Sequence, residues 1–228
     1  MSEASHPRSI RSFVVRGGRT TEAQSRALRE LWPRYGLAFA PQQLDLDAAF
    51  SRAAPRVLEI GFGNGEHLAS LAAAHPTRDY LGVEVHPPGV GRLLLTLEAR
   101  QLTNVRVICH DAVEVLEAQI APASLDEVLI LFPDPWHKKR HHKRRLIQRE
   151  FAETLAGRLK AGGLLTLATD WRPFAEHMLQ VLNACVLLEN CSPGAEYASA
   201  SVERAPTRFE RRGTRLGHEV LELSYRRR

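Results

Sequence analysis

The sequence has few cysteines, no long apolar run and no internal repeat. Three of its 228 residues are cysteine, without a CxxC pair, so we expect reduced thiols and exclude a disulfide-stapled miniprotein. The longest unbroken apolar runs are short pieces such as Val128–Phe132, which excludes a membrane-spanning helix. The first eight residues lack the apolar stretch of a secretory signal. We therefore expect a cytoplasmic protein with no membrane partner.

What the chain does have is enough apolar residues for one sizeable domain, and positive charge gathered in three segments. Hydrophobic residues make up 44% of the chain, which excludes a mostly disordered protein. Residues 1–21 carry four arginines and one acid, and residues 203–228 carry eight arginines and four acids. Residues 137–145 carry six lysines and arginines and no acid, whereas the remainder is net acidic. This distribution favours a polyanionic partner, since surface solubility alone predicts interspersed signs.

Short apolar runs alternate with helical stretches from Arg56 onward. We expect strands at residues 56–60, 80–85, 105–109, 126–132 and 163–169, and a late antiparallel strand at 219–225. We expect helices at residues 21–31, 66–74, 90–101, 113–119, 143–159 and 173–185, and a long loop at 192–217. The alternation predicts an α/β fold with a mostly parallel sheet and helices on both faces. Residues 1–50 are expected to form a basic N-terminal arm and helix, and residues 51–228 the domain.

A glycine-rich turn follows the first expected strand. The segment Glu59-Ile-Gly61-Phe-Gly63-Asn-Gly65 lets the backbone turn tightly and approach a ligand closely. Its GxGxG spacing places the third glycine one position earlier than the GxGxxG dinucleotide fingerprint does, which argues against an NAD-dependent dehydrogenase. A tight turn without a ligand would also explain the glycines.

Acidic residues end the first three expected strands. Glu59, Glu84 and Asp111 should meet at one edge of a parallel sheet, where ligands of such sheets bind. Glu84 suits a ribose diol, whereas Asp111 with Glu114 would also form a helix capping box. Three carboxylates would repel a phosphate-rich ligand. They suit a cationic, adenosine-containing ligand such as S-adenosylmethionine.

A rigid turn and a cationic run follow the fourth expected strand. In Pro133-Asp134-Pro135-Trp136 the prolines restrict the backbone, and the tryptophan offers a flat face for a nucleobase. A simple Asp-Pro turn is the alternative. The cationic run that follows, residues 137–145, favours contacts with phosphate groups over a solvated helix face. Its histidines match no metal motif, and we predict no metal site. The residues of the run expected to bind RNA are Lys139, Arg140, His141, His142, Lys143, Arg144 and Arg145.

These motifs together resemble those of the bacterial tRNA (guanine-N7-)-methyltransferases. The matching segments are RSFVVRGGRTTEAQ at 11–24, EIGFGNG at 59–65, GVEVH at 82–86, DA at 111–112, LFPDPWxKKRHHKRR at 131–145, TD at 169–170 and TRFE at 207–210. The family's members methylate guanine 46 in the variable loop of tRNA. The resemblance therefore implies a class I methyltransferase with a Rossmann-like, seven-stranded sheet, S-adenosylmethionine as cofactor and tRNA as partner. We infer no obligate protein partner.

The resemblance also implies roles for individual residues. Acids matching Glu59, Glu84, Asp111 and Asp134 line the cofactor site beside the turn of Gly61, Gly63 and Gly65, and Asp134 is the expected catalytic residue. The positions expected to contact the substrate are Lys138, Asp170, Thr207, Arg208, Phe209 and Glu210. Asp170 would equally serve as the N-cap of the next helix, and residues 207–210 as a plain loop. His137 and Arg208 stand where the family commonly has proline and lysine.

Two other functions remain open on the residues alone. A class I methyltransferase acting on an exocyclic amine of a nucleobase would use the same fold and must also remove an N–H proton. A non-catalytic RNA-binding protein with a vestigial cofactor pocket would keep the basic segments, but it would not need the acids at the strand ends.

Overall fold

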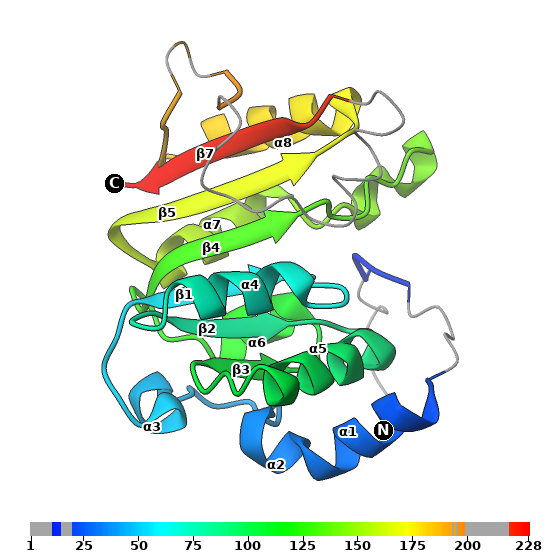
Figure 1. The fold of residues 1–228 in the computed structure, drawn as a ribbon. Coiled ribbons are helices and arrows are strands. Elements are labelled where there is room, and N and C mark those ends of the chain that lie inside the picture. The colour runs from blue at the N-terminus through cyan, green and yellow to red at the C-terminus, as the bar shows by residue number, and fades with distance from the viewer. Residues whose placement is uncertain (1–10, 15–19, 193, 195, 199–218) are drawn as a thin grey trace, which may run out of the picture.

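The computed structural model of the chain describes residues 11–14, 20–192, 194, 196–198 and 219–228. Seven strands within these residues form one sheet in the order β3-β2-β1-β4-β5-β7-β6 (Figure 1). The strands are β1 (Arg56–Ile60), β2 (Asp79–Val83), β3 (Val105–Ile108), β4 (Leu125–Leu131), β5 (Leu159–Thr169), β6 (Leu188–Asn190) and β7 (Leu221–Arg227). Strands β1 to β5 pair in parallel, and β7 runs antiparallel to both β5 and β6. The predicted fold class and the antiparallel last strand are confirmed.

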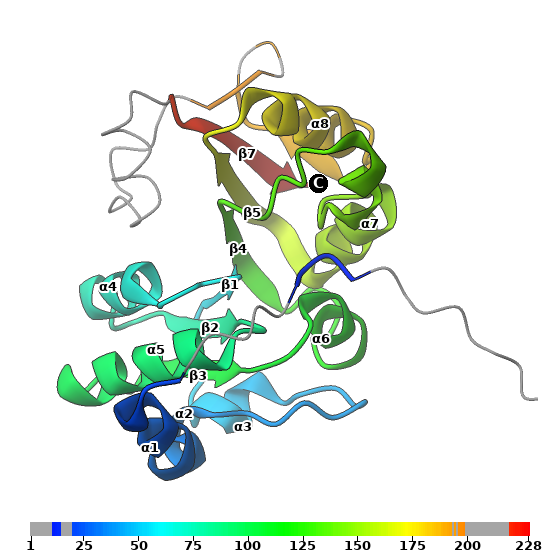
Figure 2. The ribbon, with the colours of Figure 1, turned by 90° about the vertical axis from the view of Figure 1, so that its right-hand side faces the viewer.

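Helices cover both faces of the sheet, as Figure 2 shows. They are α1 (Glu22–Glu30), α2 (Trp32–Tyr35), α3 (Leu46–Phe50), α4 (Glu66–Ala74), α5 (Pro87–Ala99), α6 (Ala112–Ala118), α7 (Arg149–Arg158), α8 (Arg172–Asn183) and the 3₁₀ helix η1 (Lys139–Arg144). One apolar core joins the sheet to α6, α7 and α8, and the other joins it to α4, α5 and α1. Strands β1 and β2 are buried along their whole length, and this includes their charged residues Arg56, Glu59 and Asp79, each of which has a polar partner.

Most predicted elements agree with the structure to within a few residues, but the helix expected at 143–159 is wrong. The chain instead forms η1, leaves the helical conformation at Arg145, and enters α7 only at Arg149. A continuous helix would stack like charges of the cationic run on successive turns, which is unfavourable. The break also turns the side chains of Arg145 and Ile147 into the protein, where they are 4% and 1% exposed.

Three short elements have no counterpart in the sequence prediction: α2, α3 and β6. Helix α3 depends on a buried ion-pair network at the amino ends of β1 and β2. Asp79 is fully buried and pairs with both Arg52 and Arg56, and Arg56 also donates to Asp47 at 2.6 Å. Five residues are too few to form a helix by themselves, so tertiary contacts supply the stability that the local sequence lacks.

The turn between β1 and α4 requires glycine at its last position. Gly65 has φ +74°, and a Cβ atom there would approach the buried side chain of Leu93 to 2.6 Å. Both the left-handed backbone and the close contact disfavour any other residue. Helix α5 is therefore packed directly against the end of the turn.

We predict that Gly65→Ala lowers the free energy of unfolding by about 1–3 kcal/mol, because alanine is strained at this φ and meets Leu93. Gly157→Ala in α7 is the control. A Cβ at Gly157 meets nothing within 4 Å, so the stability should stay the same or rise by up to about 1 kcal/mol. Urea unfolding measures both. Equal midpoints for the two variants would contradict the assigned packing.

Candidate active site

The glycine turn exposes bare backbone at the carboxyl edge of the sheet. Gly61 and Gly63 have φ +73° and +59°, and a Cβ atom built on either would meet no other atom within 4 Å. The space above the turn is therefore open, unlike the packed space at Gly65. Such a turn allows a ligand to approach the main chain more closely than side chains would permit.

Glu84, directly after β2, holds this turn in place. Its Oε2 accepts a hydrogen bond from the Gly63 N–H at 2.9 Å, and its Oε1 accepts from the N–H groups of Val85 at 2.7 Å and His86 at 3.0 Å. Burial raises the pKa of the Glu84 carboxyl, and the three backbone donors counteract part of that rise. A carboxylate oxygen can accept two hydrogen bonds, so Oε2, which accepts one from the described residues, can still accept one from a ligand hydroxyl.

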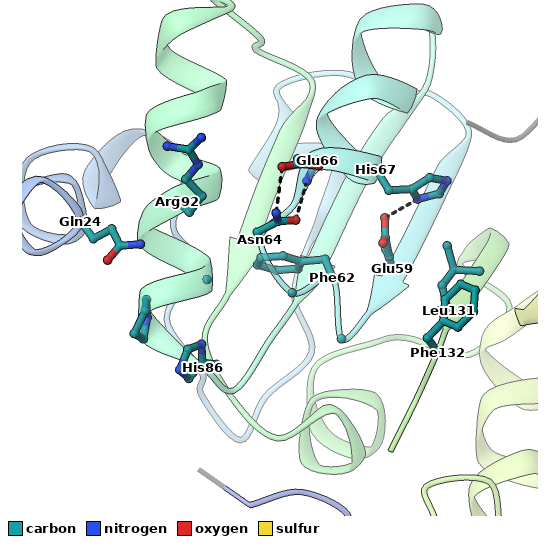
Figure 3. A pocket seen from close by; sticks show the side chains of 14 residues that line it. Gln24, Glu59, Phe62, Asn64, Glu66, His67, His86, Arg92, Leu131 and Phe132 are labelled. Atoms are coloured by element: carbon teal, nitrogen blue, oxygen red, sulfur yellow. Dashed lines mark hydrogen bonds and ion pairs between the residues drawn. The ribbon is translucent and has the colours of Figure 1, made fainter. Parts of the chain in front are cut away.

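Glu59 occupies the centre of the site on β1. Its side chain faces α4, is 4% exposed, and contacts His67 Nδ1 through Oε2 at 3.1 Å (Figure 3). No described residue forms a hydrogen bond with the other carboxylate oxygen, Oε1. A carboxylate with one uncommitted oxygen beside a cavity suits a positively charged ligand.

A cavity of about 760 Å³ lies along the glycine turn. It is lined by the turn, by the first turns of α4 and α5, by the end of β4 and by Gln24 of α1. Among the predicted cofactor residues, Glu59, Gly61 and Gly63 line this cavity. Gly65, Glu84, Asp111 and Asp134 are not among its lining residues. Glu84 is nevertheless connected to the cavity through its hydrogen bond to Gly63.

Asp111 follows β3 and caps α6. Its side chain accepts from the Val113 N–H at 3.0 Å, and burial raises the pKa of its carboxyl. The expected capping box does not form, because Glu114 pairs with His110. The side chain of Asp111 is only partly buried, so both the predicted cap and a ligand contact are compatible with its position.

The Pro133–Trp136 turn projects Asp134 into solvent at the end of β4. Asp134 is exposed, and two residues near it, Phe132 just before the turn and Trp136 at its end, have φ +53° and +48°. Left-handed conformations at residues other than glycine cost about 1–3 kcal/mol each and persist only where surrounding contacts hold them. One such contact is the hydrogen bond from the Phe132 N–H to the Ala168 carbonyl at 2.8 Å.

One face of the Trp136 ring, which the sequence suggested as a flat surface for a nucleobase, is covered by a cation. The guanidinium of Arg144 lies 5.0 Å from the centre of its ring, and His141 meets the ring edge-on at 5.9 Å. Its Nε1–H donates to the carbonyl oxygen of Ser12 at 2.9 Å. The ring therefore connects the N-terminal segment to the cationic run, which sequence reasoning did not foresee.

Arg145 differs from its neighbours in the cationic run. Lys138, Lys139, Arg140 and Lys143 are exposed, whereas Arg145 is 4% exposed. Its guanidinium lies 5.6 Å from the Trp171 ring and 5.1 Å from the Phe174 ring. Its Nε donates to the Pro135 carbonyl at 3.1 Å, and burial lowers its pKa. The predicted phosphate contact by Arg145 is therefore wrong, because its side chain supports the turn from inside the protein.

Asp170 follows β5 directly and lies beside the residues that support the turn. The N-cap position of α8 is occupied by Trp171, so the alternative role of Asp170 as a helix N-cap is not observed. His137 packs on the Trp171 ring at 4.4 Å, which brings the segment after β4 next to the segment after β5. Thr207, Arg208, Phe209 and Glu210 lie outside the described residues.

In the part of the chain that the structure describes, no cluster of three or more His, Cys, Asp or Glu residues could hold a metal ion. No helix among these residues is both long enough and apolar enough to cross a membrane.

Comparisons with known proteins identify relatives along nearly the whole chain. A family model described as a putative methyltransferase matches residues 53–223. A tRNA (guanine-N(7)-)-methyltransferase of Thiobacillus denitrificans is 60% identical over 219 residues, which are 96% of each chain. One of Alkalilimnicola ehrlichii is 58% identical over 228 residues, covering 99% of this chain and 95% of that one.

Solved structures agree on the fold. The 16S rRNA methyltransferase KamB matches with a TM-score of 0.56 at 18% identity, over 81% of this chain and 95% of that one. TrmN from Thermus thermophilus matches with a TM-score of 0.55 at 17% identity, over 90% of this chain and 48% of that one. The sheet order and the extent of the sequence identity lead to one conclusion: the chain belongs to the family of tRNA (guanine-N(7)-)-methyltransferases.

Proposed function

We propose that the chain transfers the methyl group of S-adenosylmethionine to N7 of a guanine in tRNA, at position 46 of the variable loop. The observation that carries this proposal is the 60% identity over 219 residues with a relative named for the N7 activity. Action on tRNA and three cysteines without a disulfide fit the expected cytoplasmic location. Residues 1–50 would form an N-terminal arm and helix that take part in substrate binding.

The described residues fit this cofactor. Open space above Gly61 and Gly63 leaves room for a ligand against the main chain, and Glu59 has an oxygen without a described partner. Glu84 and Asp111 stand at the next two strand ends, where a ribose diol and a base would find acceptors. S-adenosylmethionine supplies a methyl group on positively charged sulfur. Acidic groups on three adjacent strands favour such a cation.

Guanine N7 carries a free lone pair and no proton, so its methylation needs no general base. Catalysis then depends mainly on alignment of the base with the methyl group, which can contribute about 7–11 kcal/mol. Asp134 is exposed on a restrained turn, where its carboxylate can accept from the N1–H and amino group of guanine. It also stabilises the positive charge that develops on the base. The gross attraction is about 4 kcal/mol at 4 Å and an effective dielectric constant of 20, and only its increase toward the transition state accelerates the reaction.

The exposed cations after this turn would bind the RNA backbone. Lys138, Lys139, Arg140 and Lys143 carry no acidic partner in the described structure and lie in the segment that immediately follows Asp134. Contacts of this kind fix the orientation of a nucleic acid without reading its bases. Asp170 and residues 207–210 remain proposed substrate contacts.

We predict that Asp134→Asn abolishes most turnover while it leaves S-adenosylmethionine binding within about threefold of wild type. The amide replaces an acceptor with a donor of the same shape, so the base loses its alignment. Transfer of labelled methyl groups to unmodified tRNA measures the turnover, and calorimetry measures the cofactor affinity. Borohydride–aniline cleavage of the product RNA identifies N7 as the methylated atom. Wild-type turnover by the variant would exclude Asp134 from catalysis, and product RNA that resists cleavage would favour an exocyclic amine as the target.

We predict that tRNA affinity falls steeply with salt and that the slope of log K against log[salt] decreases when Lys138, Lys139 and Lys143 become alanine. Each lost phosphate contact should reduce the slope by roughly 1. Lys160→Ala removes a cation from the opposite edge of the sheet, where Lys160 pairs with Asp126, and should leave the slope unchanged. The same slope in wild type and the triple variant would remove these lysines from the RNA interface.

We predict that Arg145→Ala lowers the free energy of unfolding by about 2–4 kcal/mol, because it leaves a cavity beside two aromatic rings and an unpaired Pro135 carbonyl. Lys139→Ala on the exposed side of η1 should change it by less than about 0.5 kcal/mol. Urea unfolding compares the two variants. An Arg145→Ala protein of wild-type stability with a smaller salt slope would return Arg145 to the RNA interface.

A further inference from the structure

The contact between Glu59 and His67 is a buried polar pair at the wall of the cavity. Their side chains are each 4% exposed, and both residues line the cavity. His67 stands in the first turn of α4, whose other buried positions are leucine and alanine. The hydrogen bond from Nδ1 to Glu59 is its only polar contact with the described residues, since Nε2 is buried without a partner. A histidine in such surroundings has one evident polar partner, the carboxylate of Glu59.

We propose that His67 is a positioning residue that holds Glu59 Oε2, so that Oε1 is presented to the α-ammonium group of the cofactor. This inference rests on the proposed function, because it assumes S-adenosylmethionine as the ligand. The cofactor has two cationic centres, the sulfonium and the α-ammonium. Of these two, only the ammonium has N–H groups that can donate hydrogen bonds to a carboxylate oxygen. Glu59 Oε1, which has no described partner beside the cavity, matches such a donor.

The hydrogen bond explains why a histidine suits this position. The contact to Glu59 assigns a ring proton to Nδ1. Nε2 has no partner among the described residues, so the ring makes this one side-chain hydrogen bond, which fixes the orientation of the carboxylate. Glutamate has several rotatable bonds, and fixing one oxygen in advance reduces the entropy lost when the ligand binds.

The geometry distinguishes three substitutions of His67. Asparagine carries an N–H donor close to the position of Nδ1, whereas glutamine carries its donor near the position of Nε2, directed away from Glu59. Leucine removes every donor and leaves Glu59 unpaired. The ranking of cofactor affinity should therefore be wild type and His67→Asn above His67→Gln and His67→Leu.

Two ligands separate positioning from a general structural role. S-adenosylhomocysteine carries the amino-acid group, whereas 5′-methylthioadenosine keeps the nucleoside thioether but lacks the whole amino-acid group, ammonium and carboxylate alike. Calorimetry with the full-length variants should show a loss of roughly tenfold or more in S-adenosylhomocysteine affinity for His67→Gln and His67→Leu. Affinity for 5′-methylthioadenosine should stay within about twofold of wild type, and His67→Asn should keep both affinities.

A further comparison tests whether His67 acts through Glu59. Glu59→Gln should by itself lower S-adenosylhomocysteine affinity, and adding His67→Gln to it should cause little further loss, because both changes remove the same interaction. Additive losses in the double variant would overturn the proposal. So would equal losses for both ligands, or a His67→Asn protein as weak as His67→Gln.

The outcomes also separate this inference from the proposed function. A wild-type protein that methylates tRNA at N7, with variants that bind both ligands alike, refutes the positioning role and leaves the function intact. A wild-type protein that binds neither S-adenosylmethionine nor S-adenosylhomocysteine refutes both. If His67→Leu does not fold, the comparison of His67→Asn with His67→Gln decides the question, since both keep a polar amide in the site.

Discussion

The carboxylate of Glu84 accepts hydrogen bonds from three backbone N–H groups, and the glycine turn depends on this interaction. One donor belongs to Gly63 and two belong to the start of the next connection, so a single side chain joins the carboxyl ends of β1 and β2. Because the turn lacks side chains at Gly61 and Gly63, it cannot be held by packing above it. The hydrogen bond to Glu84 replaces that packing, and the side of the main chain at Gly61 and Gly63 that faces the cavity stays open for a ligand.

The Pro133–Trp136 turn is held by the cationic side chain of Arg145, whereas the glycine turn is held by the carboxylate of Glu84. Arg145 donates to the Pro135 carbonyl and packs against two aromatic rings at the start of α8. Its neighbours in the same run remain exposed, so one short segment serves both the interior and the surface. This arrangement explains the strained backbone around Asp134: contacts on both sides hold the turn, while its carboxylate stays in solvent.

Glu59 and Asp134 thus occupy contrasting environments at neighbouring strand ends. Glu59 is buried with a histidine partner in a cavity wall, which suits a small cation that enters and is enclosed. Asp134 is exposed and directly precedes the cationic run in sequence, which suits a base that belongs to a large polyanion such as RNA. The N-terminal segment joins this region, since the Ser12 carbonyl accepts from Trp136 across 124 positions of sequence.

The sequence by itself determined most of the strands and helices in their order along the chain, the glycine turn and the acids at the strand ends, because these follow from local periodicity and from where a parallel strand stops. It also carried the family motifs. The tertiary structure decided which residues of the cationic run face solvent and which face the protein interior. It also decided which polar residue contacts Glu59 and which residues contact the Trp136 ring. Arg145, His67 and Ser12 carry no local signal for these roles. Their partners lie on other elements, and only the packing of α4, α8 and the N-terminal segment on one sheet brings them together.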